Sequence, residues 1–160
     1  MNLDTLLKQA MELEKVQAML YKGLEKKFSF SKEISQFWSE MARDESGHYE
    51  HMIKMCNQFT PEQLSMEVDD ALYNKVCKGL RELKFSRLES VVDLYDACEF
   101  AAEIEDYETV AVLEFIKARF EHDPYRLEAF NIMRVHMDKL ASFSDKFKSL
   151  DDRRKIKAIS

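Results

Sequence analysis

The sequence predicts an all-α protein, an antiparallel four-helix bundle with one long crossover between its second and third helices. Only three glycines and two prolines occur in 160 residues, so the chain must be built from a few long elements. Four segments repeat apolar residues at steps of three and four, the period of an amphipathic helix. Short loops join the first two segments and the last two, as antiparallel neighbours require, and a long connection separates the pairs.

The first helix is expected from about Asp4 to Phe28, with a break at residues 29–31. The second is expected to run to about Cys56, with Ser31 as its N-cap because a serine side chain can accept a hydrogen bond from the first turn. On each helix, the residues expected to face the core form a stripe along one side. The stripe of the first helix is Leu3, Leu7, Ala10, Glu14, Gln17, Tyr21, Leu24 and Phe28. The stripe of the second is Phe37, Met41, Glu45, His48, Met52 and Met55.

A crossover of about residues 57–89 follows, with a short helix expected from Asp69 to Leu83. The third long helix is expected from Ser90 to about Phe120, and Pro124 suits the first position of the fourth. The stripe of the third helix is Val91, Leu94, Cys98, Ala101, Glu105, Glu108, Val112 and Phe115. The stripe of the fourth is Tyr125, Ala129, Ile132, His136, Leu140, Phe143 and Phe147. Residues 1–148 are therefore expected to form the bundle, and residues 149–160 a C-terminal tail. Within this tail, the basic segment from Asp151 to Lys157 is expected to be a frayed helix end.

Charge and composition narrow the classes of function. A net charge of −6 argues against a nucleic-acid surface. No apolar run approaches the roughly 20 residues of a membrane span, and the N-terminus lacks the apolar core of a signal peptide, so a cytoplasmic location without a membrane partner is expected. The three cysteines have no CxxC spacing, which indicates reduced thiols rather than a metal finger.

Polar residues interrupt all four stripes near the midpoint of each helix. Antiparallel helices of similar length bring their midpoints to one level, so these residues should converge on one layer of the core. Burying an unpaired carboxylate costs several kcal/mol, and the stripes contain no Lys or Arg to balance the charge. Divalent cations would balance it, and mixed carboxylate and imidazole ligands suit iron or manganese. The interruptions are Glu14, Gln17, Glu45, His48, Glu105, Glu108 and His136.

Four motifs carry a resemblance to a known family. Glu45 and His48 form an E-x-x-H pair, whose side chains share one helix face. The segments ELEKVQAMLY, FWSEMARDESGHYEHM, ACEFAAEIEDYETV and NIMRVHMDKL resemble the four helices of the rubrerythrin-like branch of the ferritin-like superfamily, which are di-iron carboxylate bundles. The resemblance implies metal ligands at Glu14, Glu45, His48, Glu105 and His136, with Glu105 bridging and Glu108 as an extra, mobile carboxylate. Tyr21 is either a hydrogen-bond donor to a carboxylate or an ordinary core residue.

The fourth motif departs from the family at one position. Met133 stands three residues before His136, where the family has a glutamate, and a thioether is a poor ligand for ferrous iron or manganese. Glu14 and Glu105 repeat at a spacing similar to that of His48 and His136, whereas Glu45 has no counterpart. The loss removes one carboxylate and should weaken one of the two metal positions most.

Two functions therefore stay open, and with them the question whether the chain is an enzyme. One is a di-iron or manganese oxidoreductase of the peroxidase or oxidase type. Its electrons would come from an external donor, because the chain has no CxxC pairs of its own, and a homodimer is plausible for this family. The other is a non-catalytic bundle with a degenerate or single-metal site that serves as a binding or structural module. Iron handling in an oligomeric shell ranks last.

Overall fold

The computed structural model describes residues 1–107, 110–120, 135–136, 138–147 and 149–160. It is an all-α, ferritin-like helical bundle, as the sequence predicts; the described residues contain isolated bridges but no strand. Its elements are α1 (Leu3–Lys27), α2 (Lys32–Cys56), α3 (Pro61–Leu64), α4 (Asp70–Glu82), the 3-10 helix η1 (Phe85–Ser90), α5 (Leu94–Asp106), α6 (Val110–Arg119) and α8 (Leu150–Lys155). Residues 135–136 and 138–146 are also helical and belong to the predicted fourth helix.

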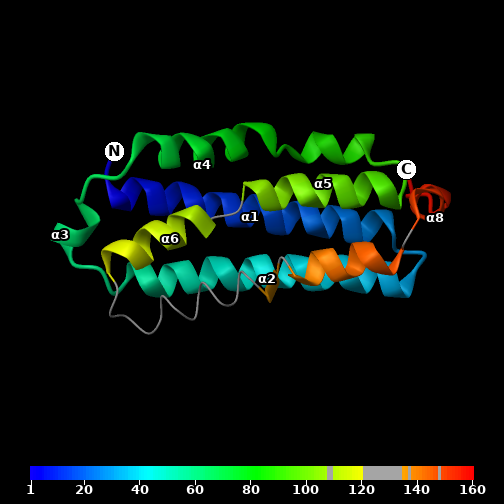
Figure 1. The fold of residues 1–160 in the computed structure, drawn as a ribbon, viewed down its shortest axis with the longest axis horizontal. Helices are drawn as coiled ribbons and strands as arrows, with labels where there is room; N and C mark the ends of the chain where they lie inside the picture. Colours follow the sequence, from blue (N-terminus) through cyan, green and yellow to red (C-terminus); the bar gives the residue numbers. More distant parts are fainter. Residues whose placement is uncertain (108–109, 121–134, 137, 148) are drawn as a thin grey trace.

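The first hairpin pairs α1 with α2, which lie side by side along the molecule (Figure 1). Asn2 caps α1 by accepting a hydrogen bond from the backbone N–H of Thr5 at 3.0 Å. Ser31 caps α2 in the same way, accepting from the N–H of Ile34, as the sequence predicts. Both helices begin and end within a residue of the expected bounds, because local capping and apolar periodicity agree there.

The crossover returns along α1 and passes through α3, α4 and η1 (Figure 1). Thr60 and Gln63 form a capping box at α3, each side chain accepting from the backbone N–H of the other. The short helix expected from Asp69 to Leu83 is confirmed as α4. Gly79 of α4 lets that helix approach α1 closely, because a Cβ atom there would lie 3.2 Å from Leu13 Cδ1.

The prediction of one continuous third helix from Ser90 to Phe120 is wrong. The side chain of Asp93 accepts from the N–H of Asp96 at 2.9 Å and so starts α5 at the next residue. At the other end Tyr107 forms a turn, packs against the Gly79 backbone and donates its hydroxyl to Glu82. These contacts with α4 coincide with the end of α5, and α6 begins as a separate helix.

The last part of the chain closes the bundle. Its helical residues 138–146 lie along α2, where Lys139 Nζ pairs with Asp44 Oδ2 at 2.6 Å (Figure 1). Pro124, Tyr125, Ala129, Ile132 and Met133 lie outside the described residues.

The expected fraying of the C-terminal tail is wrong. Ser149 caps α8 by accepting from the N–H of Asp152 at 3.0 Å. The N–H of Leu94 donates to the Ile156 carbonyl, and the N–H of Ala158 donates to that of Val92, both at 2.9 Å. These backbone bonds hold the tail against the start of α5.

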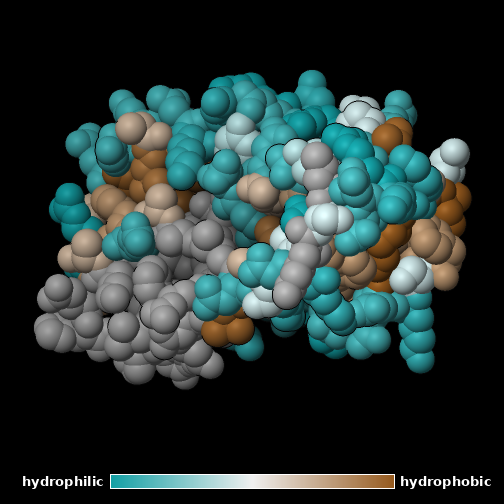
Figure 2. All heavy atoms as spheres, turned by 45° about the vertical axis from the view of Figure 1, so that its right-hand side comes forward, coloured by the Kyte–Doolittle hydropathy of each residue, from teal (hydrophilic) through white to brown (hydrophobic). Residues whose placement is uncertain are grey.

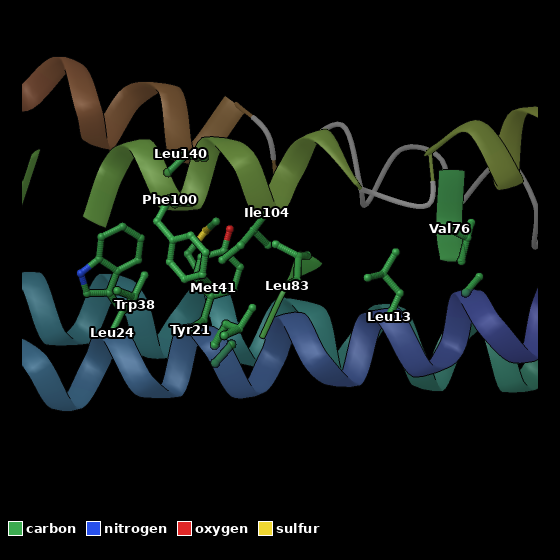
Figure 3. Packing of buried hydrophobic residues seen from close by; sticks show 14 of the residues in the cluster. Leu13, Tyr21, Leu24, Trp38, Met41, Val76, Leu83, Phe100, Ile104 and Leu140 are labelled. Atoms are coloured by element: carbon green, nitrogen blue, oxygen red, sulfur yellow. The ribbon is translucent and has the colours of Figure 1, made fainter. Parts of the chain in front are cut away.

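The core is an apolar layer of buried side chains between the long helices, and the described residues on the face in Figure 2 are mostly hydrophilic. Tyr21, Trp38, Met41 and Ile104 lie inside this layer (Figure 3) and have no exposed surface. Within the described residues, no helix combines the length and the apolar composition that a bilayer span requires.

Candidate metal centre

The predicted layer of polar residues is present at mid-height of the bundle. Its side chains come from α1, α2, α5 and the fourth helix, and each is at least nine-tenths buried although it carries ionisable or amide groups. The members are Glu14 (0% exposed), Gln17 (0%), Glu45 (0%), His48 (3%), Glu105 (7%) and His136 (1%). Glu108, the remaining predicted ligand, lies outside the described residues.

Glu45 lies at the middle of the layer, between the two histidines. Its Oε2 is 2.9 Å from His48 Nδ1, and its Oε1 is 3.5 Å from His136 Nδ1. One ligand atom from each of these three residues falls within 4.8 Å of the others, a spacing at which they could hold a metal ion. The two imidazole rings are 5.2 Å apart and nearly perpendicular.

Two further carboxylates flank this trio. Glu14 Oε2 lies 3.4 Å from His48 Nδ1, and Glu105 Oε2 lies 3.4 Å from His136 Nδ1. Each histidine nitrogen is thus placed between two carboxylates, one of which is Glu45. The result is a contiguous row across the bundle, Glu14–His48–Glu45–His136–Glu105, with an approximate two-fold arrangement about Glu45.

The environment favours the neutral form of His136. Burial lowers the pKa of its imidazole below the ordinary value, and the charge of Glu105 opposes that shift only in part. Neutral imidazole is the form that binds metal ions. Three carboxylates and two imidazoles in a buried layer form a donor set that fits iron or manganese, and no sulfur ligand is involved among the described members.

Residues around the row hold it in place. The hydroxyl of Tyr21 donates to Glu105 Oε1, which is the first of the two roles that the sequence left open for it. Gln17 Nε2 donates to the Ile104 carbonyl at 3.0 Å and so ties α1 to the last turns of α5. Among the described residues, Gln17 Oε1 has no hydrogen-bond partner.

Sequence reasoning missed one neighbour of the site. The indole of Trp38 lies nearly parallel to the Tyr21 ring, with centroids 6.0 Å apart and planes 13° apart. Trp38 is apolar and falls beside the predicted stripe of α2 rather than on it, so periodicity gave no signal. Its contact with Tyr21 relates it to the polar layer.

Comparison with known protein families gives a match over most of the chain. A family model described as Rubrerythrin matches residues 5–134, which include every predicted ligand except His136. A search of curated proteins found no match, and neither did a search of solved structures.

Proposed function

The chain belongs to the rubrerythrin family, and on that premise we propose that it binds iron or manganese in the buried row and reduces hydrogen peroxide with electrons from an external donor. The observation that carries the proposal is the placement of each histidine Nδ1 between two buried carboxylates, at 2.9–3.5 Å. A purely structural polar layer would not need so many acidic groups in one place, because each costs free energy to bury.

Particular residues would hold the metal ions. Glu14 and His48 lie at one end of the row, and Glu105 and His136 lie at the other. Glu45 turns one oxygen to each histidine and lies between these two pairs, so it would help to hold an ion at either end. When bound, the metals would supply the electron transfer to the peroxide O–O bond.

The protein's own residues would prepare the site for that chemistry. Tyr21 fixes the orientation of Glu105 through its hydrogen bond. Burial keeps bulk water from the row and strengthens every electrostatic interaction within it. Neutral His136 is ready to bind without first losing a proton.

A second candidate function rests on Met133. With a thioether where the family has a carboxylate, one metal position loses a ligand, and the chain would then hold a single ion, or none, as a binding or structural module. Metal stoichiometry separates the two functions.

The decisive experiment is anaerobic loading with ferrous iron or manganese, followed by metal analysis of the desalted protein. Two ions per chain and consumption of peroxide with a small-molecule electron donor are expected. One ion, or none, would contradict the di-metal proposal.

A substitution at the departed position tests the degenerate site directly. Met133→Glu restores the missing carboxylate and should raise metal occupancy if that position is the weak one. Met19→Glu is the matched control, because Met19 is 56% exposed on α1 and the same change of residue there adds no ligand to the row. Equal occupancy in both variants would show that Met133 does not limit binding.

The external donor and the homodimeric state stay proposals, as does the cytoplasmic location. Light scattering of the metal-loaded protein tests the homodimer.

A further inference from the structure

A run of aromatic side chains leads from the buried row towards the outside of the bundle. It starts at Tyr21, which donates to Glu105, and continues to Trp38, whose ring lies nearly parallel to that of Tyr21. Trp38 in turn contacts Phe37 and Phe143, with ring centroids 4.8 and 5.5 Å away. Both Tyr21 and Trp38 are completely buried, and Figure 3 shows them in the layer beside α1 and α2.

The run ends at the surface. The rings of Phe37 and Phe143 stack in parallel with centroids 3.7 Å apart, and each is 8% exposed. They line a surface pocket of about 530 Å³ whose other lining residues are Lys32, Glu33, Gln36, Glu40 and Lys146. One layer of rings therefore separates Trp38 from the outside.

Tyrosine and tryptophan are the aromatic side chains that give up an electron most readily, and phenylalanine is not oxidised under the same conditions. A tyrosine loses its electron more easily when its proton has somewhere to go, and the Tyr21 hydroxyl already points at Glu105 Oε1. The redox-active part of the run is thus the pair Tyr21–Trp38.

We propose that Tyr21 and Trp38 form a one-electron relay between the metal row and the Phe37–Phe143 face. The inference rests on the proposed peroxide reduction and says by which route its electrons travel. The proposal is supported by neighbouring rings that form an uninterrupted series of contacts from Glu105 to the surface pocket.

Each passage moves one electron. Tyr21 gives its electron to the cleavage of the peroxide O–O bond at the row, and its phenolic proton moves to Glu105 Oε1. Trp38 then reduces the tyrosyl radical, the proton returns from Glu105, and the indole is left as a radical cation. The external one-electron donor reduces that cation through the Phe37–Phe143 face. Two passages, with two protons from solvent, convert one hydrogen peroxide to two waters.

The test uses the single tryptophan of the chain. Iron-loaded protein is mixed with hydrogen peroxide without any donor, frozen rapidly and studied by electron paramagnetic resonance, with and without ring-deuterated tryptophan. An organic radical whose hyperfine pattern changes on deuteration is expected, and it can only be Trp38 because no other tryptophan exists. Peptide mass spectrometry of the same sample should find Trp38 oxidised.

Two tyrosine variants check the route. Tyr21→Phe should abolish the tryptophan radical, because it removes the proton-coupled step next to the row. Tyr107→Phe is the matched control. Tyr107 also donates to a glutamate, but this is Glu82 of α4, and the residue lies in the turn that follows α5, so the radical should persist.

The outcomes separate the relay from the proposed function. If the wild-type protein binds iron and consumes peroxide but gives neither a tryptophan radical nor oxidised Trp38, the relay is overturned and the peroxide reduction stands. Persistence of the radical in Tyr21→Phe also overturns the relay. If metal analysis finds no iron, or peroxide is not consumed, the proposed function itself falls, and the relay with it.

Discussion

Replacing Glu45 by glutamine should stabilise the metal-free protein while weakening its affinity for metal. Glu45 and Glu14 both lie against the same nitrogen of His48, at 2.9 and 3.4 Å, so their carboxylates are close neighbours in a fully buried site. Two negative charges about 6 Å apart repel by roughly 3 kcal/mol at an effective dielectric constant of about 20. Folding bears this cost because both carboxylates are brought together in a buried site.

The amide keeps the shape of the side chain and a hydrogen bond to His48 but carries no charge, so the substitution should relieve most of the repulsion between residues 45 and 14. We expect the metal-free Glu45→Gln variant to gain about 1–3 kcal/mol, which raises the melting temperature of a chain of this size by roughly 2–4 °C per kcal/mol. Thermal unfolding in the presence of a chelator measures it. Glu50→Gln is the control, since Glu50 is exposed on the same helix and should change stability by less than about 0.5 kcal/mol.

Bound metal should reverse the order of stability, so that the wild type becomes more stable than the Glu45→Gln variant. A ligand at 100 times its Kd stabilises the folded state by about 2.7 kcal/mol, and the variant, lacking the shared carboxylate, should gain much less from the same metal concentration. A Glu45→Gln variant that melts below the wild type in chelator would refute the reasoning. It would show that Glu45 is part of a satisfied hydrogen-bonded network rather than a carboxylate held in place for a cation.

Other regions of the chain give further tests. Gly79→Ala and Gly47→Ala gain the same helix propensity, but only Gly79→Ala adds a Cβ at 3.0 Å from Tyr107 Cβ. We therefore expect Gly79→Ala to be less stable than Gly47→Ala by about 1–3 kcal/mol in urea unfolding. Equal stabilities would contradict the close packing of α4 at Gly79. Burial raises the pKa of the Cys56 thiol to about 11 from 9.0. At pH 8 its thiolate should therefore be about 100-fold scarcer than in the urea-unfolded chain, and iodoacetamide labelling followed by peptide mass spectrometry should be slower by at least that factor. Labelling at the unfolded rate would show that partial burial does not shield the Cys56 thiol.

The parts of the fold that local chemistry determines could be predicted from the sequence. The N-cap at Ser31 and the bounds of the first two helices follow from capping and periodicity, which act within a few residues. The break after α5 could not be predicted, because it coincides with contacts between Tyr107 and residues of α4 far away in the sequence. The order in the tail depends likewise on backbone bonds to Val92 and Leu94, which no local pattern indicates.

The candidate site, too, could be predicted from the sequence only in part. The polar interruptions of the stripes identified its buried side chains, because acids and histidines on a core face are conspicuous. Which carboxylate lies between the two histidines is a property of the assembled bundle, and there the geometry favours Glu45. Trp38 was missed because an apolar ring in a core carries no such signal, although its position against Tyr21 gives it a chemical neighbour.

The end of α5 has an electrostatic consequence for the site. The last turns of α1, α2 and α4 each carry a lysine or arginine, which offsets the partial negative charge at a helix C-terminus, whereas α5 ends at Glu105 and Asp106 with no basic residue. The carbonyl groups at the C-terminal end of α5 therefore add to the negative potential that the carboxylates of the row already create. A cation bound beside Glu105 would take the place that a lysine or arginine occupies on α1, α2 and α4, so that metal affinity and the stability of the last turn of α5 would rise together.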